Sequence, residues 1–258
     1  MKLYVVSDIH GFYDEFVRAL DKSGFNPEDP EHLLIVCGDT VDRGANPSMT
    51  ISYLSNLMDI GKCVVVKGNH ESLVLECCAR GFPYSYDYSN GTFDTICELG
   101  GAGEGRSFDG CCVVAEEKFK PFVEKMVDYY ETENYIFVHS FIPLKRLDDM
   151  PKHYTRGRVY EQMDNWREAH SGDWEDARWG NPFDLAKRGL LPDKCLVFGH
   201  WHTSWPRHYW SWSDEASPEF GLEADFSPYY GDGFIGIDGC TAYSGVVNII
   251  VLEDNLIK

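Results

Sequence analysis

The sequence has no cysteine pair spaced as Cys-x-x-Cys, and no apolar run approaches the ~20 residues that a membrane-spanning helix needs. Its nine cysteines are scattered, and an odd number without a pattern is typical of reduced thiols rather than of a disulfide framework. The first expected strand starts at Lys2, which leaves no room for a secretion signal. These features predict a cytoplasmic protein without a membrane partner.

Basic residues are also scarce, with 23 Lys and Arg against 42 Asp and Glu, which gives a formal net charge of −19. Such a surface repels nucleic acid and anionic membranes, so neither is expected as a partner. The 258 residues are 43% hydrophobic, which is enough for a sizeable core, and no internal repeat divides them. We therefore expect one domain over residues 1–258, while the sequence leaves the oligomeric state open.

Short apolar runs alternate with amphipathic segments. The apolar runs predict strands at residues 3–6, 33–36, 64–66, 135–138, 196–198, 233–237 and 246–252. Apolar residues at helical spacing predict helices over residues 13–22, 48–58, 71–79 and 117–131. The alternation through the first 80 residues predicts parallel strands in one sheet, with helices packed outside.

Three stretches interrupt this pattern. Residues 81–112 are rich in Gly, Tyr, Ser and Asp and predict an inserted loop or small helical segment. Residues 143–194 are charged and carry no strand signal, and residues 201–232 form a second, strongly aromatic insert. The tryptophans in the second insert predict a packed cluster, and a substrate-facing aromatic wall is the alternative.

Four motifs that end in metal-ligand residue types directly follow predicted strands. They are Ser7-Asp8-Ile9-His10-Gly11, Gly38-Asp39-Thr40-Val41-Asp42-Arg43-Gly44, Gly68-Asn69-His70-Glu71 and Gly199-His200-Trp201-His202, and a fifth strand ends at His139. The first three motifs lie about thirty residues apart, roughly the length of one βαβ unit. We therefore expect carboxylates, imidazoles and an amide to converge at one edge of the sheet.

Such a set of side chains is suited to two divalent metal ions. In a two-metal site the ions lie about 3.5–4 Å apart, so that one carboxylate can bridge them, and Asp39 is the bridging candidate. The other candidate ligands are Asp8, His10, Asn69, His139 and His200. Mixed oxygen and imidazole ligands favour Mn²⁺, with Fe²⁺ or Zn²⁺ as alternatives. A water that bridges the metals would lose a proton easily and act as the nucleophile.

Three further residues predict phosphoryl chemistry. The Arg43 guanidinium suits the negative charge on the equatorial oxygens of a phosphoryl group in transfer. His70 follows a candidate ligand and is placed to protonate the leaving oxygen, with Asp42 accepting its other ring N–H. No Ser or Cys is placed as a nucleophile, so direct in-line attack without a phosphoenzyme is expected.

These motifs resemble those of the PPP-type metallophosphatases of the calcineurin-like metallophosphoesterase superfamily. That family includes protein serine/threonine phosphatases, phage-type phosphatases and diadenosine-tetraphosphatases. Its signature has three motifs: Gly-Asp-x-His-Gly, Gly-Asp-x-Val-Asp-Arg-Gly and Gly-Asn-His-Glu. Residues 38–44 and 68–71 match the second and third in full, and residues 7–11 match the first except that Ser7 replaces its first glycine. The resemblance covers nearly the whole chain. It implies an α/β fold, a four-layer α-β-β-α sandwich with the site at the sheet edge.

The resemblance also implies roles for individual residues. One metal would be held by Asp8, His10 and Asp39, and the other by Asp39, Asn69, His139 and His200. Asp42 and His70 would form the acid pair, and Arg43 the phosphate clamp. Two positions stay open: Arg178, with Arg188 behind it, is the candidate second phosphate-binding arginine, and His202 is a ligand in some branches of the superfamily only.

The leading functional hypothesis is a metal-dependent phosphatase of phosphomonoesters, with phosphoserine or phosphothreonine in protein as substrate. The alternative is a dinucleoside-polyphosphate hydrolase, because the string Phe198-Gly199-His200-Trp201 is similar to that branch. A third hypothesis, from another class, is a non-catalytic metal-binding scaffold. Segments 81–112 and 201–232 are expected to shape specificity.

Overall fold

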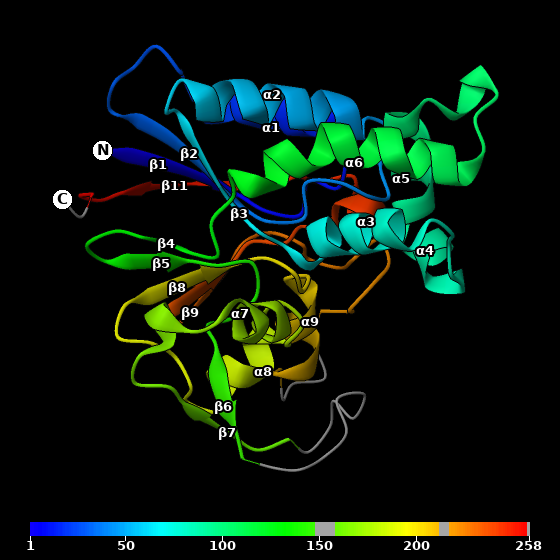
Figure 1. Cartoon of the computed structure of the whole chain (residues 1–258). Coiled ribbons are helices and arrows are strands. Elements are labelled where there is room, and N and C mark those ends of the chain that lie inside the picture. Colours follow the sequence, from blue (N-terminus) through cyan, green and yellow to red (C-terminus); the bar gives the residue numbers. More distant parts are fainter. Residues whose placement is uncertain (148–157, 212–216, 257–258) are drawn as a thin grey trace.

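Two β-sheets lie face to face between two layers of helices in the computed structural model, which describes residues 1–147, 158–211 and 217–256 (Figure 1). The layer order of helix, sheet, sheet and helix confirms the α/β class and the sandwich that the resemblance implies. The two ends of the chain meet at one edge, where the amino group of Met1 donates a hydrogen bond to the carbonyl of Asp254 at 3.2 Å.

The first sheet contains the strands predicted near the amino terminus. Its order is β11 (Ile249–Glu253), β1 (Lys2–Val6), β2 (His32–Cys37) and β3 (Cys63–Val66). Strands β1, β2 and β3 are parallel, and β11 runs antiparallel to β1. The carboxyl ends of the three parallel strands therefore meet at one edge, as expected.

The second sheet has the order β4 (Tyr130–Glu131), β5 (Tyr135–Phe137), β8 (Cys195–Phe198), β10 (Phe234–Gly236) and β9 (Tyr229–Gly231). Strands β5, β8 and β10 are parallel. The prediction that all metal-ligand segments follow strands of one sheet was therefore wrong. The late strand β11 occupies the place beside β1, so the strands before His139 and His200 pair with each other.

Side chains of the first sheet alternate between two apolar environments. Leu3 and Val5 pack toward the second sheet, whereas Tyr4 and Val6 pack against helices. All four are at most 3% exposed, so the strand is buried on both faces. This explains its continuous apolar sequence, which is typical of a covered parallel strand.

The helices form both outer layers. Over the first sheet lie α1 (Tyr13–Ser23), α2 (Pro47–Asp59), α3 (Asn69–Arg80), α5 (Thr92–Gly100) and α6 (Phe108–Glu124). Against the second sheet lie α7 (Ser171–Ala177) and α8 (Pro182–Lys187), which bury Trp174 and Phe183. The three helices predicted within the first 80 residues are confirmed. No helix in the described part of the chain is long and apolar enough to span a membrane.

Shorter elements make up the rest. They are the helices α4 (Ser85–Asn90), α9 (Ser204–Tyr209) and α10 (Thr241–Ser244), the 3₁₀ turns η1 (Ala102–Glu104) and η2 (Trp166–Glu168), and the hairpin of β6 (Leu144–Arg146) and β7 (Tyr160–Gln162). The segment 81–112 is thus helical over much of its length, which is one of the two alternatives expected for it. In segment 201–232, Trp205 and Trp210 pack on Phe183, and Trp212 lies outside the described residues.

Two predictions of local structure were wrong. The helix expected over 117–131 begins at Phe108 and ends at Glu124, because the following chain pairs with the first sheet: Val127 N–H donates to the Val65 carbonyl at 3.0 Å. The hairpin of β6 and β7 lies in the stretch where no strand was expected. Its strands are three residues long, too short to show a period.

Candidate metal centre and active site

The loops after β1, β2 and β8 contain residues in the left-handed backbone region. Their φ angles are 51° at Asp8 and His10, 54° at Asp39, 71° at Asp42, 67° at Arg43 and 65° at His200. This conformation is unfavourable for residues other than glycine, and it persists only where the surrounding structure enforces it. All six are candidate site residues, so the strained backbone serves to aim their side chains at one place.

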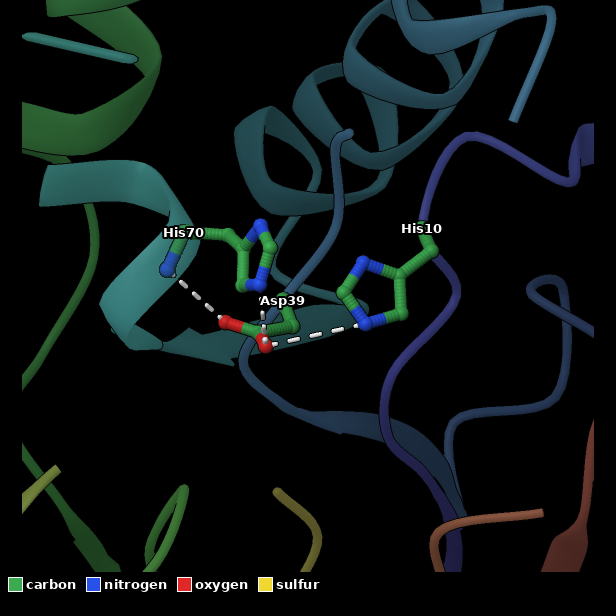
Figure 2. A group of neighbouring side chains, drawn as sticks. All are labelled: His10, Asp39 and His70. Carbon is green, nitrogen blue, oxygen red and sulfur yellow. Dashed lines mark hydrogen bonds and ion pairs between the residues drawn. The ribbon is translucent and has the colours of Figure 1, made fainter. Parts of the chain in front are cut away.

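Asp39 lies at the centre of this place. Its Oδ2 is 3.7 Å from His10 Nε2 and 3.8 Å from His70 Nε2 (Figure 2). Its Oδ1 is 3.4 Å from His139 Nε2, on the side of the second sheet. The two oxygens of one carboxylate therefore face two different groups of imidazoles, which is the arrangement expected of a bridging ligand.

The first group combines His10, His70 and Asp39. His10 Nδ1 lies 3.0 Å from the Val41 carbonyl, and a hydrogen bond there leaves Nε2 as the lone-pair nitrogen. That nitrogen is also 3.8 Å from Asp8 Oδ1. The residues predicted to hold the first metal are thus brought together by the loops after β1 and β2.

The second group combines Asp39, His139 and His200. His139 Nδ1 donates to the Cys37 carbonyl at 2.8 Å, so its Nε2 carries a lone pair in the neutral ring. This Nε2 faces Asn69 Oδ1 at 2.9 Å and His200 Nδ1 at 3.1 Å. Several buried electron-pair donors therefore point at one another, and a cation between them would satisfy them all.

Electrostatics support the same conclusion. Burial lowers the pKa of His10 well below its usual range and that of His200 to about 3, so both rings are neutral, as metal ligands must be. Burial alone would raise the pKa of Asp39, but its attraction to the neighbouring imidazoles in their protonated form, His139 most of all, holds it well below its usual range. The donor set of buried carboxylates, neutral imidazoles and an amide fits two divalent ions.

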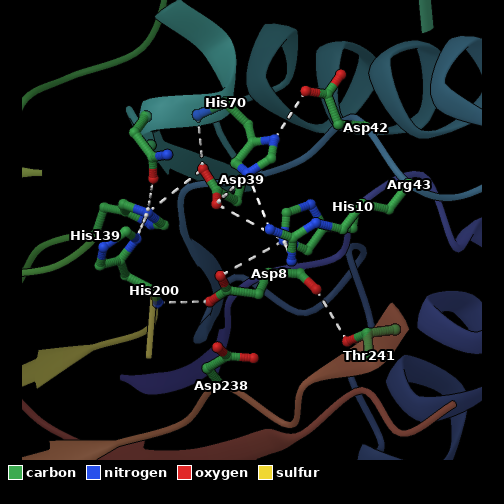
Figure 3. Close-up of polar contacts among 12 residues, drawn as sticks. Asp8, His10, Asp39, Asp42, Arg43, His70, His139, His200, Asp238 and Thr241 are labelled. Atoms are coloured by element: carbon green, nitrogen blue, oxygen red, sulfur yellow. Dashed lines mark hydrogen bonds and ion pairs between the residues drawn. The ribbon is translucent and has the colours of Figure 1, made fainter. Parts of the chain in front are cut away.

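The predicted acid pair of Asp42 and His70 adjoins the first group and shares His70 with it (Figure 3). His70 Nδ1 lies 2.8 Å from Asp42 Oδ2, and both side chains are buried. Burial lowers the His70 pKa, but the charges of Asp39 and Asp42 and the Asp42 hydrogen bond outweigh it, so the net pKa is raised. The exposed Arg43 guanidinium lies 3.1 Å from His10 Nε2 and 3.3 Å from His70 Nε2, at the mouth of the site.

Three other candidate residues lie apart from these groups. Arg178 is buried and pairs with Asp128 and Glu175, both at 2.5 Å. Arg188 pairs with Asp184 on α8. His202 Nδ1 is 2.8 Å from Ser204 Oγ and its Nε2 is 3.4 Å from Glu219 Oε1. Within the described residues, neither metal-ligand group includes His202.

Reasoning from the sequence missed several residues that support the site. Glu71 belongs to a recognised motif but received no role, although its carboxylate accepts hydrogen bonds from Thr40 and Gly68. Asp238 lies close enough to Asp8 to raise its pKa, second only to burial. The Thr241 hydroxyl donates to the Asp8 carbonyl at 2.9 Å. Glu71 lies in a recognised motif, whereas the contacts of Asp238 and Thr241 with Asp8 depend on the packing of distant segments.

Two glycines allow the ligand loops to approach one another. A Cβ at Gly68 would overlap Asp39 Oδ1, and one at Gly199 would overlap Asp8 Oδ2. Neither position has a positive φ, so close approach rather than conformational freedom requires glycine there. The motif glycines before Asn69 and His200 therefore provide room for the candidate ligands.

Comparison with known proteins agrees with this geometry. Residues 1–225 match the family model described as calcineurin-like phosphoesterase. A symmetrical bis(5'-nucleosyl)-tetraphosphatase of Buchnera aphidicola is 42% identical over 71 residues, which are 28% of this chain and 24% of that protein. The alignment thus spans about a quarter of that relative.

A longer match is found with the asymmetrical bis(5'-nucleosyl)-tetraphosphatase PrpE of Halalkalibacterium halodurans. It is 23% identical over 201 residues, which cover 67% of this chain and 76% of that protein. Among solved structures, the cold-active protein-tyrosine phosphatase of a Shewanella species superposes with a TM-score of 0.57 at 15% identity, over 98% of this chain and 76% of that one. This structural match supports a similarity of fold and nothing more.

Proposed function

The chain belongs to the calcineurin-like phosphoesterase family, and from that premise we propose that it hydrolyses a phosphoric ester at a two-metal centre built on Asp39. The observation that carries the proposal is the division of the Asp39 carboxylate between two groups of imidazoles. A structural metal site needs one closed set of ligands, whereas a shared carboxylate supports a pair of ions.

The residues present would hold the two ions as follows. Asp8, His10 and Asp39 would hold one, and Asp39, Asn69, His139 and His200 the other. When bound, the ions would supply positive charge to the phosphoryl oxygens and would acidify water. Mn²⁺ is the first candidate, with Fe²⁺ and Zn²⁺ as alternatives, since all three accept imidazole together with oxygen ligands.

Protein side chains would protonate the leaving group and bind the phosphoryl oxygens. His70 would give a proton to the leaving oxygen, while Asp42 holds the opposite ring nitrogen and favours the protonated form. Arg43 would bind the phosphoryl oxygens, because its guanidinium is exposed directly over His10 and His70. Arg178 stays a candidate second clamp only if it leaves Asp128 and Glu175.

The preferred substrate in this proposal is a phosphomonoester of an aliphatic alcohol, such as phosphoserine or phosphothreonine in a protein. An alkoxide is a poor leaving group and needs a proton from a positioned acid more than a phosphate leaving group does. The buried Asp42–His70 pair supports this class, because it holds such an acid at the site.

A second candidate substrate is a dinucleoside tetraphosphate. The relatives described above are named as tetraphosphatases of this kind, and one of them aligns with 67% of this chain. The same centre would then cleave a phosphoanhydride. His70 would contribute less, since the leaving group is already stable as an anion.

The test compares three substrates on protein purified without chelator and supplied with Mn²⁺. A phosphoseryl peptide, diadenosine tetraphosphate and 4-nitrophenyl phosphate are assayed for kcat/KM, and bound metal is counted on the same sample. Two metals and preferred turnover of the peptide support the first proposal, whereas preference for diadenosine tetraphosphate supports the second. Two metals without turnover of any substrate would favour a scaffold and contradict both.

A further inference from the structure

A threonine in segment 81–112 is hydrogen-bonded to the carboxylate of the acid pair. Thr92 Oγ1 donates to Asp42 Oδ2 at 2.6 Å, the same oxygen that lies 2.8 Å from His70 Nδ1. Thr92 and Asp42 are fully buried and His70 is 3% exposed, so water does not compete for these bonds. Thr92 is the first residue of α5, an element outside every motif of the site.

The same turn of α5 contacts the Asp42–Arg43 backbone twice more. Thr95 Oγ1 accepts the Asp42 N–H at 3.1 Å, and a Cβ on Gly91 would overlap the Arg43 nitrogen. Asp42 and Arg43 both have left-handed backbone, which needs enforcement by neighbouring structure. Residues 91–95 supply that enforcement.

We infer that Thr92 is a positioning residue for leaving-group protonation, acting through Asp42 on the His70 ring. This inference rests on the proposed role of His70 as the acid. The other Asp42 oxygen, Oδ1, has no hydrogen-bond partner among the described residues. The Thr92 hydroxyl and the His70 ring thus share one oxygen, and the hydroxyl fixes the rotation of the carboxylate plane.

Loss of the hydroxyl has a defined consequence. The carboxylate can then turn either oxygen toward His70, and the ring loses its fixed orientation toward the leaving group. Loss of a hydrogen-bond partner behind a metal ligand costs about 10- to 100-fold in activity, and by analogy we expect a loss of the same size here. The loss falls on kcat for substrates that need the acid, while KM changes little because Thr92 does not reach the substrate.

The chain offers a matched control for the variant. Thr132 Oγ1 donates to Asp254 Oδ2 at 2.6 Å, and its residue is also fully buried. It precedes β5, at the end of that strand opposite His139. Thr132→Val therefore removes a buried Thr–Asp bond of the same length without touching the site, and its unfolding midpoint calibrates the structural cost of Thr92→Val.

The experiment measures kcat and KM for phenyl phosphate, a poor leaving group, and 4-nitrophenyl phosphate, a good one. Thr92→Val is expected to lower kcat for phenyl phosphate about 10- to 100-fold and to affect 4-nitrophenyl phosphate much less. Thr92→Ser, which keeps the hydroxyl, should restore kcat, and Thr132→Val should behave as wild type.

His70→Asn separates the two possible failures. If His70→Asn makes kcat depend more strongly on the leaving group and Thr92→Val does not, the positioning role of Thr92 is wrong and the acid role of His70 stands. If His70→Asn leaves the dependence unchanged, the acid role falls and the inference falls with it. Equal losses on both substrates in Thr92→Val, unrestored by Thr92→Ser, would also overturn the inference, because they indicate general damage.

Discussion

The carboxylate of Glu71 holds the backbone of Asp39: its Oε2 accepts the Asp39 N–H at 3.2 Å. The same oxygen accepts the Gly68 N–H at 2.7 Å, and Oε1 accepts both the N–H and the hydroxyl of Thr40 at 2.8 Å. One buried side chain therefore ties the loop after β2 to the loop after β3. The position of the bridging candidate depends on it.

Glu71→Gln is expected to weaken the metal centre. The amide offers an N–H where the wild-type oxygens accept hydrogen bonds, so a buried donor faces other donors at a cost of about 1–3 kcal/mol in unfolding free energy. Metal affinity or kcat/KM should fall about 10- to 100-fold. Metal titration and thermal unfolding check this, with Glu76→Gln on the exposed face of α3 as control. Wild-type behaviour of Glu71→Gln would contradict the role.

Gly199→Ala should disturb the ligand loops by steric overlap. The added methyl would overlap Asp8 Oδ2 and the Ser7 side chain, so we expect metal affinity to fall by about 10-fold or more. Gly172→Ala is the control, because a Cβ there meets nothing within 4 Å and its φ is not positive. Metal titration by fluorescence or calorimetry compares the two. An unchanged affinity in Gly199→Ala would mean that the loops do not need this close approach.

His70→Asn should lower turnover strongly and keep both metals. Loss of a general acid lowers kcat by about 100- to 10,000-fold, whereas the two metal-ligand sets proposed here do not include this ring. Metal counting and steady-state kinetics on one preparation check this. His70 Nε2 lies 3.8 Å from Asp39 Oδ2, so loss of one metal in the variant would instead reassign the ring as a ligand.

Metal binding should release more protons at pH 6 than at pH 8. Burial, followed by repulsion from Asp238 and Asp39, raises the pKa of Asp8, and burial raises that of Asp238 to about 6. With a pKa of about 6, the Asp238 carboxyl is about half protonated in the metal-free protein at pH 6 and already ionised at pH 8, so a nearby cation displaces a proton from it mainly at the lower pH. Calorimetry in buffers of different ionisation enthalpy measures the release. A greater release of protons at pH 8 than at pH 6 would contradict the prediction.

Acid should weaken one ion pair far from the site. Two hydrogen bonds from Arg167, at 2.7 and 2.8 Å, lower the pKa of Glu131 to about 2, with Lys194 adding to the effect. A lowered folded pKa gives stability that is full above the ordinary pKa of about 4.3 and is lost as pH falls toward 2. The unfolding free energy of Glu131→Gln should therefore depend less on pH between about 5 and 2 than that of wild type. Glu117→Gln, at an exposed position, should keep the wild-type slope. A wild-type slope in Glu131→Gln would contradict the prediction.

The sequence alone indicated the candidate ligands, because each lies in a short motif directly after an apolar run. Strand, turn and ligand are then local features, and Asp8, Asp39 and Asn69 follow their strands as predicted. The first three helices are also local, since apolar residues at helical spacing define them. The resemblance of residues 38–44 and 68–71 to one family predicted the four-layer arrangement, which the periodicity of the sequence does not predict.

Only the tertiary structure decided how distant segments meet. Which strands are neighbours depends on burial shared between segments as distant as β1 and β11, so the split of His10 and His139 between two sheets is invisible to local periodicity. The same holds for Asp238 beside Asp8 and for the Thr92 hydroxyl on Asp42, since neither neighbour lies in the other's motif. Residue chemistry specified what can bind a metal or move a proton. Long-range packing specified which of those groups face one another.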